Sequence, residues 1–598
     1  MNALVSSVWC CVVLSLLCVH TFGESTNTFW SSSYNRTRTF SRRTRDTSSP
    51  APIDCKLKSW TSWTPCDSCT DKTVRFQYVE HLSQFGGTRC VHSQWDEKLC
   101  PQEVEECNPQ DQCGDMYACP ESGRCIGQHL RCNGDNDCMQ GSDEDDCQEI
   151  RERETKCVGM LPIPGAEKAI QGYNALSDVF VDRVLDHNYF GGICEYIYNG
   201  EWRMLTYDAF CENLYYSDDE KYFRMPYNFL SYRLVAQSTG QESSEYYSDA
   251  TELLEAIKTE NSFNMGVSVG VMYVEVGLSG SIEYAHLENI TKYDSKDVGF
   301  LRLVSRVETT HFKMRSQDLM LHEDMLMSLM ELPEVYDFGA YSRFISKFGT
   351  HYVTSGVMGG VLDYVVVVNK QVMIQEKLEW YEIGGCFGAS LGLSTLITQG
   401  VTAKVQAKGE KCEKIGDRNK DQQTSSNAIV DVIGFVKGGT LGHSAAQLAI
   451  RDANTYRQWG KSLKYSPAVI DHETLPIYEL VRSSTAAAQA GTRLPHLKRA
   501  WEEYMQQFNR CRCAPCRNNG VPLLSLTACS CICPNRYIGT ACEKSQQTGG
   551  PTHGAWSCWS SWSACVSGTR TQSRECNNPA PNNDGLQCLG KSVQRKHC

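Results

Sequence analysis

Two long segments of the chain alternate apolar and polar residues, which is the pattern of a β-strand with one apolar face. In the first segment the apolar positions change parity between residues 271 and 274, which predicts a turn or bulge there. In the second, the alternation continues on both sides of Gln399-Gly400, so we expect a hairpin that turns at this pair. The apolar positions are Phe263, Met265, Val267, Val269, Val271, Met272, Val274, Val276 and Leu278, and then Phe387, Ala389, Leu391, Leu393, Thr395, Ile397, Val401, Ala403, Val405 and Ala407.

Helix-like sequence brackets these hairpins, at residues 250–258 and 427–436. The second stretch places Ile429, Val432, Ile433 and Val436 at helical spacing. Two amphipathic segments of this kind fit either a half-buried sheet in a soluble core or the strands of a transmembrane barrel, in which one face meets lipid and the other a wet lumen. The pattern alone favours the half-buried sheet.

The beginning of the chain indicates export. Residues 8–19 are apolar and are followed by small and polar residues, so we expect a secretory signal over residues 1–23, too short to span a membrane. The polar, basic residues 24–45 contain the glycan acceptor Asn35 and are interpreted as a pro-segment, with a flexible basic tail as the alternative. No later run approaches the roughly 20 apolar residues of a membrane helix, so the mature protein should be soluble.

The cysteines imply a disulfide framework. The 598 residues include 32 cysteines, of which three lie in the expected signal, and the remaining 29 are an odd number. At least one is therefore free or bonded to another chain. The net charge of −12 argues against nucleic acid as a partner.

Residues 54–108 and 553–598 share an unusual pattern of cysteines, spaced tryptophans and arginines. Arginines from a neighbouring strand, such as Arg75, can stack on the faces of Trp60 and Trp63 and replace a core in so small a domain. Scattered interface tryptophans are the alternative. Both segments resemble thrombospondin type-1 repeats, which implies C-mannosylation at Trp60, Trp63, Trp556 and Trp559.

Residues 112–148 combine six cysteines with a dense acidic run, C-N-G-D-N-D-C-M-Q-G-S-D-E-D-D-C. Oxygen ligands packed this closely select calcium, and a solvated acidic loop is the alternative. The segment resembles a low-density-lipoprotein receptor class A repeat. The resemblance implies a structural calcium ion held by the side chains of Asn133, Asp137, Asp143 and Glu144 and by the carbonyls of Leu130 and Asp135.

Residues 509–543 resemble an epidermal-growth-factor-like module, which needs six cysteines. The segment has seven and the terminal repeat has five, so we expect one from each, Cys511 and Cys558, to form a disulfide.

The central residues 150–508 contain the sequence Phe348-Gly349-Thr350-His351-Tyr352. It matches the signature of the membrane attack complex/perforin family, and the order of the flanking modules is that of the family's complement members. The implied fold is multidomain α+β: a bent antiparallel β-sheet with two helical clusters, flanked by small disulfide-rich modules. The family unfurls such clusters, here near 249–300 and 380–436, into membrane-crossing hairpins, and its sheet flexes at the position of Gly438-Gly439. Membrane-facing positions would be Val267, Val269, Val276, Leu278, Leu391, Leu393, Val401 and Val405.

One feature departs from this pattern. Asn289-Ile290-Thr291 is a glycan acceptor inside the first cluster, and a glycan cannot cross a bilayer. Either the site is unused, or it stays above the membrane, or the cluster ends earlier.

The five central cysteines supply the odd count. The register of the second hairpin places Cys386 opposite Cys412. If Cys157 pairs with Cys211, Cys194 remains, beside Gly191-Gly192, which fit an exposed loop. The family resemblance implies that Cys194 holds a lipocalin-like gamma chain by an interchain disulfide; a buried free thiol is the alternative.

The resemblance further implies a plasma protein that joins a beta chain, binds the complex of complement components five to seven, enters the target lipid bilayer and recruits the ninth component. One alternative is a secreted adhesion or matrix protein with the same modules. The other is a beta chain or another perforin-like complement component.

Catalytic motifs are weak. Two Gly-x-Ser-x-Gly patterns, at 266–270 and 388–392, lie in segments expected to be strands rather than in a strand-turn-helix elbow. His322-Glu323 and His472-Glu473 lack a second histidine four residues after the first, so they do not form a zinc-protease motif. We expect no enzyme activity.

Overall fold

The computed structural model divides the chain into two units, residues 1–47 and 48–598, and all the described residues belong to the second. They are residues 49–65, 72–91, 93–100, 113–147, 155–157, 159–176, 179–198, 202–205, 212–215, 222–234, 243–247, 253, 290, 293, 298–391, 395–398, 401–404, 428–440, 453–509, 512–518, 521–525, 527–533, 537–545, 560, 563–566, 568–577, 580–581, 587 and 591–597.

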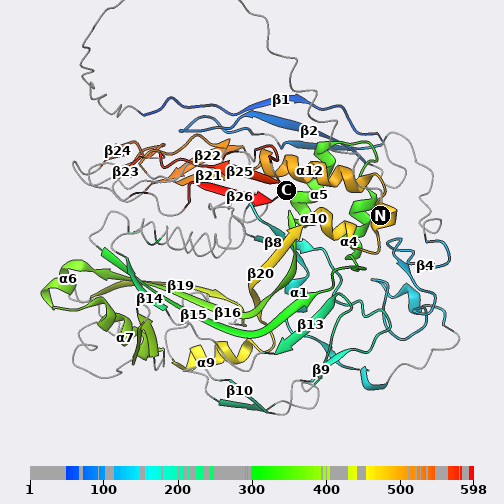
Figure 1. Ribbon diagram of the computed structural model, residues 1–598, viewed down its shortest axis with the longest axis horizontal. Coiled ribbons are helices and arrows are strands. Elements are labelled where there is room, and N and C mark those ends of the chain that lie inside the picture. Colours follow the sequence, from blue (N-terminus) through cyan, green and yellow to red (C-terminus); the bar gives the residue numbers. More distant parts are fainter. Residues whose placement is uncertain are drawn as a thin grey trace, which may run out of the picture. The chain divides into compact units, whose positions relative to one another are not determined.

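Two long antiparallel strands, β15 (Val298–Met314) and β16 (His351–Asn369), form the centre of the main sheet (Figure 1). At one end β15 pairs with β14 (Ser243–Tyr247) and β16 with β19 (Ile429–Lys437). At the other end their partners are β13 (Phe229–Leu234), β20 (Ala468–Pro476) and β7 (Gln171–Asn174), the last of which pairs with β8 (Val179–Arg183). The two long strands therefore change partners midway.

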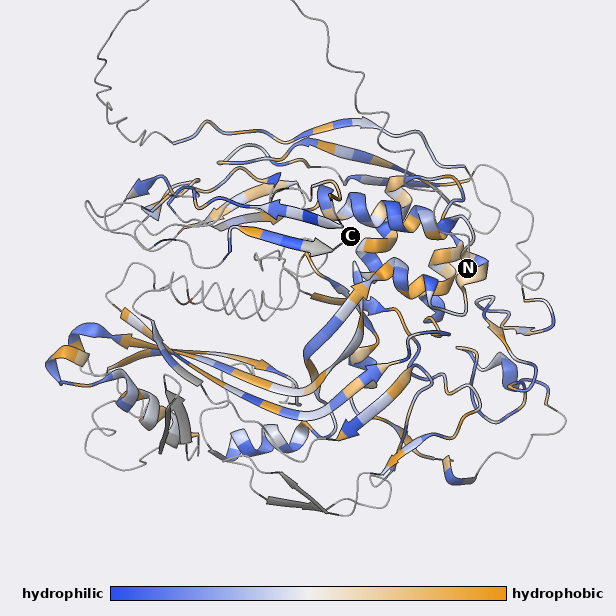
Figure 2. Cartoon of the chain, in the orientation of Figure 1, coloured by the Kyte–Doolittle hydropathy of each residue, from blue (hydrophilic) through white to orange (hydrophobic). Residues whose placement is uncertain are grey.

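At the end where β14 and β19 pair with the long strands, successive side chains of β15 point to opposite faces of the sheet. Leu301 and Leu303 pack in a cluster with Leu362 and Val366, whereas Phe300 packs in a separate cluster with its neighbours. Because successive side chains of a strand point to opposite faces, the two clusters lie on opposite sides of the sheet. Figure 2 shows hydrophobic stretches along the long strands, with hydrophilic residues between them. Both faces of the sheet are therefore covered by packed side chains. Residues 364–368 form an uninterrupted apolar run, as expected of a strand that is buried on both faces.

Helices build the core at the other end. They are α4 (Glu323–Met330), α5 (Phe338–Phe348), α10 (Ile477–Arg482) and α12 (Arg493–Gln507), and their apolar residues share one cluster with β13, β16 and β20. Helix α5 begins where the Asp337 carboxylate accepts a hydrogen bond from the Ala340 N–H at 2.9 Å, and it ends before Gly349.

The remaining elements are short. They are β1 (Lys56–Trp60), β2 (Lys72–His81), β3 (Trp95–Leu99), β4 (Tyr117–Ala118), β5 (Cys125–Ile126), η2 (Ser142–Glu144), η3 (Thr155–Cys157), β6 (Leu161–Pro162), α1 (Ala166–Ala169), β9 (Tyr196–Tyr198), β10 (Trp202–Leu205), β11 (Glu212–Tyr215), β12 (Tyr222–Arg224), α6 (Lys370–Gln375), α7 (Trp380–Ser390), β17 (Thr395–Thr398), β18 (Val401–Lys404), α9 (Ala453–Ser462), α11 (Ala487–Ala490), β21 (Val521–Ser525), β22 (Ala528–Ile532), β23 (Tyr537–Ile538), β24 (Lys544–Ser545), β25 (Thr569–Ser573) and β26 (Val593–His597).

Disulfides stabilise the flanking modules. The bonds described within them include Cys55–Cys90, Cys113–Cys125, Cys119–Cys138, Cys132–Cys147, Cys513–Cys529, Cys516–Cys531 and Cys533–Cys542. The three bonds between 513 and 542 use six cysteines, as expected of the growth-factor-like module.

The predicted hairpin is confirmed by its flanking strands, because β17 and β18 are antiparallel and Thr398 pairs with Val401. Residues 399 and 400 themselves lie outside the described residues. Two other predictions were wrong. The strand predicted from Phe387 onward does not begin there, because residues 380–390 form helix α7. The stretch 427–436 was predicted to be helix-like, but residues 429–437 form strand β19, whose apolar residues contact clusters on both faces of the sheet and so mimic helical spacing.

Candidate functional site

The signature residues form a joint between three elements. Gly349 has φ +87°, and a Cβ there would lie 2.7 Å from the Tyr173 nitrogen of β7. The Thr350 hydroxyl accepts a hydrogen bond from the Ala175 N–H at 2.9 Å, and the Trp501 indole of α12 donates to the Thr350 carbonyl at 2.8 Å. The signature therefore connects β7, the start of β16 and α12.

His351 has a structural role in this joint. Its side chain is buried, lies edge-on to the Trp501 ring and contacts the Thr350 hydroxyl through Nδ1 at 2.8 Å. Burial lowers the pKa of His351 to about 4, so the ring is neutral at pH 7.

The predicted hinge lies where β16 changes partner from β20 to β19. Gly438 and Gly439 have φ +80° and +78°, and a Cβ on Gly438 would lie 2.5 Å from the Gly359 carbonyl oxygen of β16. The Trp459 indole of α9 donates to the Gly438 carbonyl at 2.8 Å. Register shifts between Glu308 and Thr310 and between Val357 and Met358 mark the same level of the sheet. Helix α9 thus packs against a bend that only glycine fits.

Each predicted cluster connects two strands that are already paired. The chain leaves β14 at Tyr247 and returns in β15 at Val298, and it leaves β16 at Asn369 and returns in β19 at Ile429. Leu253 and Ile290 of the first cluster are fully buried against Phe300 of the sheet. Leu391 of the second cluster is 2% exposed and packs on the opposite face, and Val401 lies in β18. In both clusters, the buried apolar residues that the structure describes therefore pack against the sheet.

Polar side-chain contacts also connect β15 to β16 and the first cluster to β19. Arg302 of β15 donates to Asp363 of β16 at 2.6 Å, and both side chains are nearly buried. The Tyr293 hydroxyl, from the first cluster, donates to Asp431 of β19 at 2.5 Å.

In the acidic segment, residues 130–144, carboxylates accept hydrogen bonds from backbone N–H groups of the same segment. The Asp143 carboxylate accepts from the N–H groups of Asp137 and Cys138, and Glu144 accepts from the Asn133 N–H. Asp137 is 1% exposed, and its Oδ1 has no hydrogen-bond partner in the described chain. Burial, together with the negative charges of Asp143 and Asp135, raises the pKa of Asp137 to about 7, although the Asn133 amide acts in the opposite direction.

These residues fit a hard cation with mixed oxygen donors. A buried carboxylate oxygen without a donor is the group that a cation would satisfy. Within the described ranges no three acidic, histidine or cysteine side chains converge on one metal position, so a site here also needs the amide and the two carbonyls of the predicted set. The Asn133 amide nitrogen faces Asp137 at 2.8 Å and its oxygen faces the Asp135 N–H, so this amide has to turn to become a ligand.

The prediction that Cys194 bonds to a second chain was wrong. Cys194 is bonded to Cys157, with an S–S distance of 1.90 Å, so neither is available to Cys211 or to a second chain. The loop with Gly191-Gly192 folds back beside η3 and brings the two sulfurs together, which the spacing of the cysteines did not indicate. Cys211 lies outside the described residues.

Peptide mapping tests this bond. Digestion of the full chain without reductant should release one species that contains both Cys157 and Cys194 and separates on reduction, because the two sulfurs are already bonded. The Cys513–Cys529 peptide is the internal control. Linkage of Cys194 to any other cysteine would contradict the structure.

The predicted tryptophan–arginine stack is confirmed in residues 54–108. The Arg75 guanidinium lies 4.5 Å from the Trp60 ring and 4.4 Å from the Trp63 ring, and the Lys98 ammonium lies 4.3 Å from the Trp63 ring. The identification of this segment as a thrombospondin repeat, and the mannosylation of its tryptophans, stay predictions.

Several predicted residues lie outside the described chain. Cys386 is disulfide-bonded on α7, but its predicted partner Cys412 is not described. The others are Asn35, Val267, Val269, Val276, Leu278, Asn289, Leu393, Val405, Cys511, Trp556, Cys558 and Trp559.

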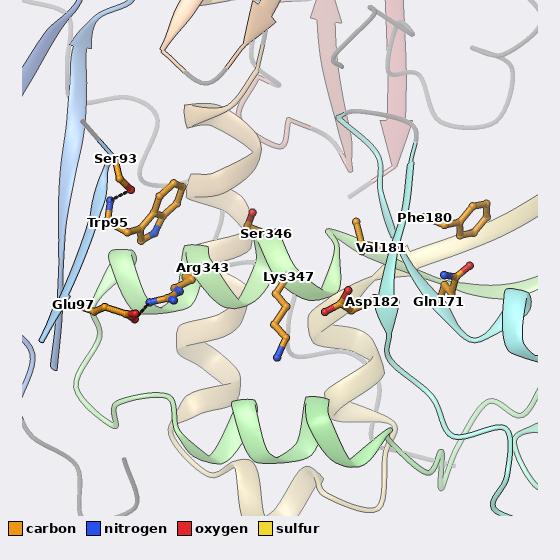
Figure 3. Close-up of a pocket in the computed structure, with 10 residues that line it drawn as sticks. All are labelled: Ser93, Trp95, Glu97, Gln171, Phe180, Val181, Asp182, Arg343, Ser346 and Lys347. Atoms are coloured by element: carbon orange, nitrogen blue, oxygen red, sulfur yellow. Dashed lines mark hydrogen bonds and ion pairs between the residues drawn. The ribbon is translucent and has the colours of Figure 1, made fainter. Parts of the chain in front are cut away.

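A cavity of about 760 Å³ lies between β3, β8 and α5 (Figure 3). Arg343 and Glu97 form an ion pair at one side, and Lys347 and Asp182 line the other. None of its lining residues is a histidine or cysteine, and the residues drawn contain no nucleophile held by a base.

Ser390, from one of the two hydrolase-like patterns, ends helix α7 rather than lying in a strand. The described chain also contains no helix long and apolar enough to cross a membrane.

Comparison with known families identifies three segments. A MAC/Perforin domain model matches residues 169–514, and a low-density lipoprotein receptor class A model matches residues 111–147. The EGF-like domain model of the complement components C8 (alpha and beta chains) and C6 matches residues 516–544.

Curated relatives match almost the whole chain. Complement component C8 alpha chain of Oryctolagus cuniculus is 42% identical over 93% of this chain and 96% of its own length. Complement component C8 beta chain of Mus musculus is 34% identical over 98% of both chains. Among solved structures, GNIP1Aa from Chromobacterium piscinae matches with a TM-score of 0.32 and 13% identity, over 72% of this chain and 68% of that one.

Proposed function

This chain belongs to the MAC/Perforin family as a homologue of the complement C8 alpha chain, and on that premise we propose that it is a pore-forming subunit of the terminal complement attack complex. It is a non-enzymatic component of the C8 type. The proposed action is that the clusters near 249–300 and 380–436 unfurl, enter the target membrane as β-hairpins and promote incorporation of the ninth component.

The observation that supports this proposal most directly is the order of four neighbouring strands. β14, β15, β16 and β19 lie side by side and are antiparallel, and each cluster joins one outer strand to one inner strand. An unfurled cluster would therefore continue two existing strands as a hairpin and would extend their hydrogen-bond ladder without a new crossing. A membrane strand needs only about 9–11 residues, so each arm is long enough to reach beyond the bilayer.

The proposed partners follow from the relatives. They are a chain of the C8 beta type, the complex of components five to seven, the ninth component and a lipid bilayer. A disulfide from Cys194 to a lipocalin-like chain is not among them, because Cys194 is bonded to Cys157. We also propose secretion into plasma and a calcium ion in the class A repeat, held by the predicted ligands and satisfying the buried Asp137 oxygen.

A site-specific fluorescence experiment tests insertion. A Val401→Cys variant, labelled with an environment-sensitive dye, would be added with the other terminal components to vesicles that carry the complex of components five to seven. The dye signal should shift to that of an apolar environment and should be quenched by lipid-bound nitroxide, because β18 belongs to the second proposed hairpin.

Val91→Cys is the matched control, because Val91 is 88% exposed and lies outside both clusters. It should show neither change. Vesicle leakage without lipid quenching at position 401 would place insertion elsewhere, and the absence of both leakage and quenching would favour a secreted adhesion protein.

A further inference from the structure

Two buried arginines connect the class A repeat and the perforin-like domain in opposite directions. Arg124 of the repeat is 2% exposed and donates to the Asp186 carboxylate at 2.7 Å and to the Leu321 carbonyl at 2.8 Å. Arg224 of β12 is 3% exposed and donates to both carboxylate oxygens of Asp135, each at 2.7 Å. The paired, planar contact of Arg224 with Asp135 fixes the orientation of both partners.

The loop of residues 186–194 contacts the acidic segment directly. A Cβ on Gly192 would lie 2.8 Å from the Leu130 side chain. Arg224 also donates to the Ile193 carbonyl of this loop at 2.9 Å. The loop is held at its end by the Cys157–Cys194 bond.

Further contacts reach the same stretch from α4 and from Arg124. The Met139 N–H donates to the Glu323 carboxylate at 2.7 Å, and Arg124 donates to the Asp137 carbonyl at 2.9 Å. Residues 130–139 and Arg124 thus form the docking surface, and residues 130–139 also contain four of the six predicted calcium ligands. A change in the position of this stretch affects docking and the cation site together.

We propose that cation binding by the class A repeat and its docking on the perforin-like domain are thermodynamically coupled, with Arg224 as the positioning residue. The inference rests on the proposed calcium site and adds its regulation: calcium strengthens the contact between the two domains, and the docked domain strengthens calcium binding by the same factor. Arg224 holds Asp135 by its carboxylate and so fixes the backbone whose carbonyl is a predicted ligand.

Charge alone predicts the opposite effect for this arginine. A guanidinium close to the site repels a divalent cation, so its removal by itself would tighten calcium binding. Coupling predicts weaker binding, because the Asp135 backbone loses its fixed orientation. The sign of the change therefore separates a positioning role from a simple electrostatic one.

The first experiment measures calcium binding to the full chain by isothermal titration calorimetry. Arg224→Gln should bind calcium about tenfold more weakly than the wild type, within the roughly 5- to 150-fold range typical of coupled sites. Arg224→Lys should lie between the two, since lysine keeps the charge but not the paired geometry. Arg233→Gln, at an exposed position of β13, is the control and should match the wild type.

The outcomes are distinct. Calcium binding by Arg224→Gln that equals or exceeds that of the wild type would overturn the coupling and leave the calcium site intact. A wild-type chain that binds no calcium would overturn the calcium site itself, and the coupling with it.

Hydrogen exchange of the wild-type chain gives a second test, which does not require any substituted protein to fold. Removal of calcium with a chelator should increase exchange at residues 186–194, which contain no predicted ligand, as well as at residues 130–144. An increase confined to residues 130–144 would overturn the proposal.

Discussion

Replacing Asp363 with alanine should lower the free energy of unfolding of the perforin-like domain by about 3–5 kcal/mol. Asp363 and Arg302 lie on adjacent strands of the main sheet, with side chains 10% and 8% exposed, and two nitrogens of the guanidinium donate to the carboxylate at 2.6 and 3.0 Å. The substitution leaves the arginine charge buried without this carboxylate, which is the costly way to break an ion pair.

Chemical denaturation followed by near-ultraviolet circular dichroism measures this effect. The double variant Arg302→Met, Asp363→Leu should recover most of the lost stability, because apolar residues of similar size avoid the cost of burying charge. Asp182→Ala, at an exposed position of β8, is the control and should change stability by less than about 0.5 kcal/mol. A loss below about 1 kcal/mol in Asp363→Ala would mean that solvent reaches Arg302.

Replacing Trp459 with alanine should cost a similar amount, about 3–5 kcal/mol, because a fully buried indole leaves a cavity between α9 and the sheet. The Gly438 carbonyl also loses its hydrogen bond. Since α9 packs on the bend, the variant should also straighten its sheet more readily. We expect faster dye release from vesicles per bound molecule, in addition to a lower midpoint of denaturation.

Two further variants sharpen this prediction. Trp459→Phe keeps most of the apolar volume and loses the indole N–H, so it should cost about 1–3 kcal/mol. Tyr465→Ala, 52% exposed shortly after the same helix, is the control and should leave both readouts unchanged. Normal stability together with slower dye release in Trp459→Ala would contradict a restraining role for α9.

The sequence predicted those features that depend on local pattern. The hairpin of β17 and β18 followed from alternation, because a period of two matches the geometry of a strand and not that of a helix. The stacking of Arg75 on Trp60 and Trp63 followed from residue types suited to a domain with little core. The signature at 348–352 and the module order led to the correct family.

Features that depend on long-range contacts were missed. Residues 427–436 were predicted to be helix-like, because a strand covered on both faces shows no strict alternation. Cys194 was assigned to another chain on the family resemblance, since nothing in the spacing shows that its loop returns to Cys157. The arginines Arg124 and Arg224 were not recognised at all, since their partners lie 62 and 89 residues away.

The four-strand order of β14, β15, β16 and β19 limits the geometry of any pore built in the proposed way. Neighbouring strands are about 4.8 Å apart, so one unfurled chain would contribute about 19 Å to the perimeter of the pore wall, before any tilt is considered. Lengthening a hairpin would raise the height of the wall without widening it. The bore would then be set by how many chains join the ring, and it would grow in steps of one chain.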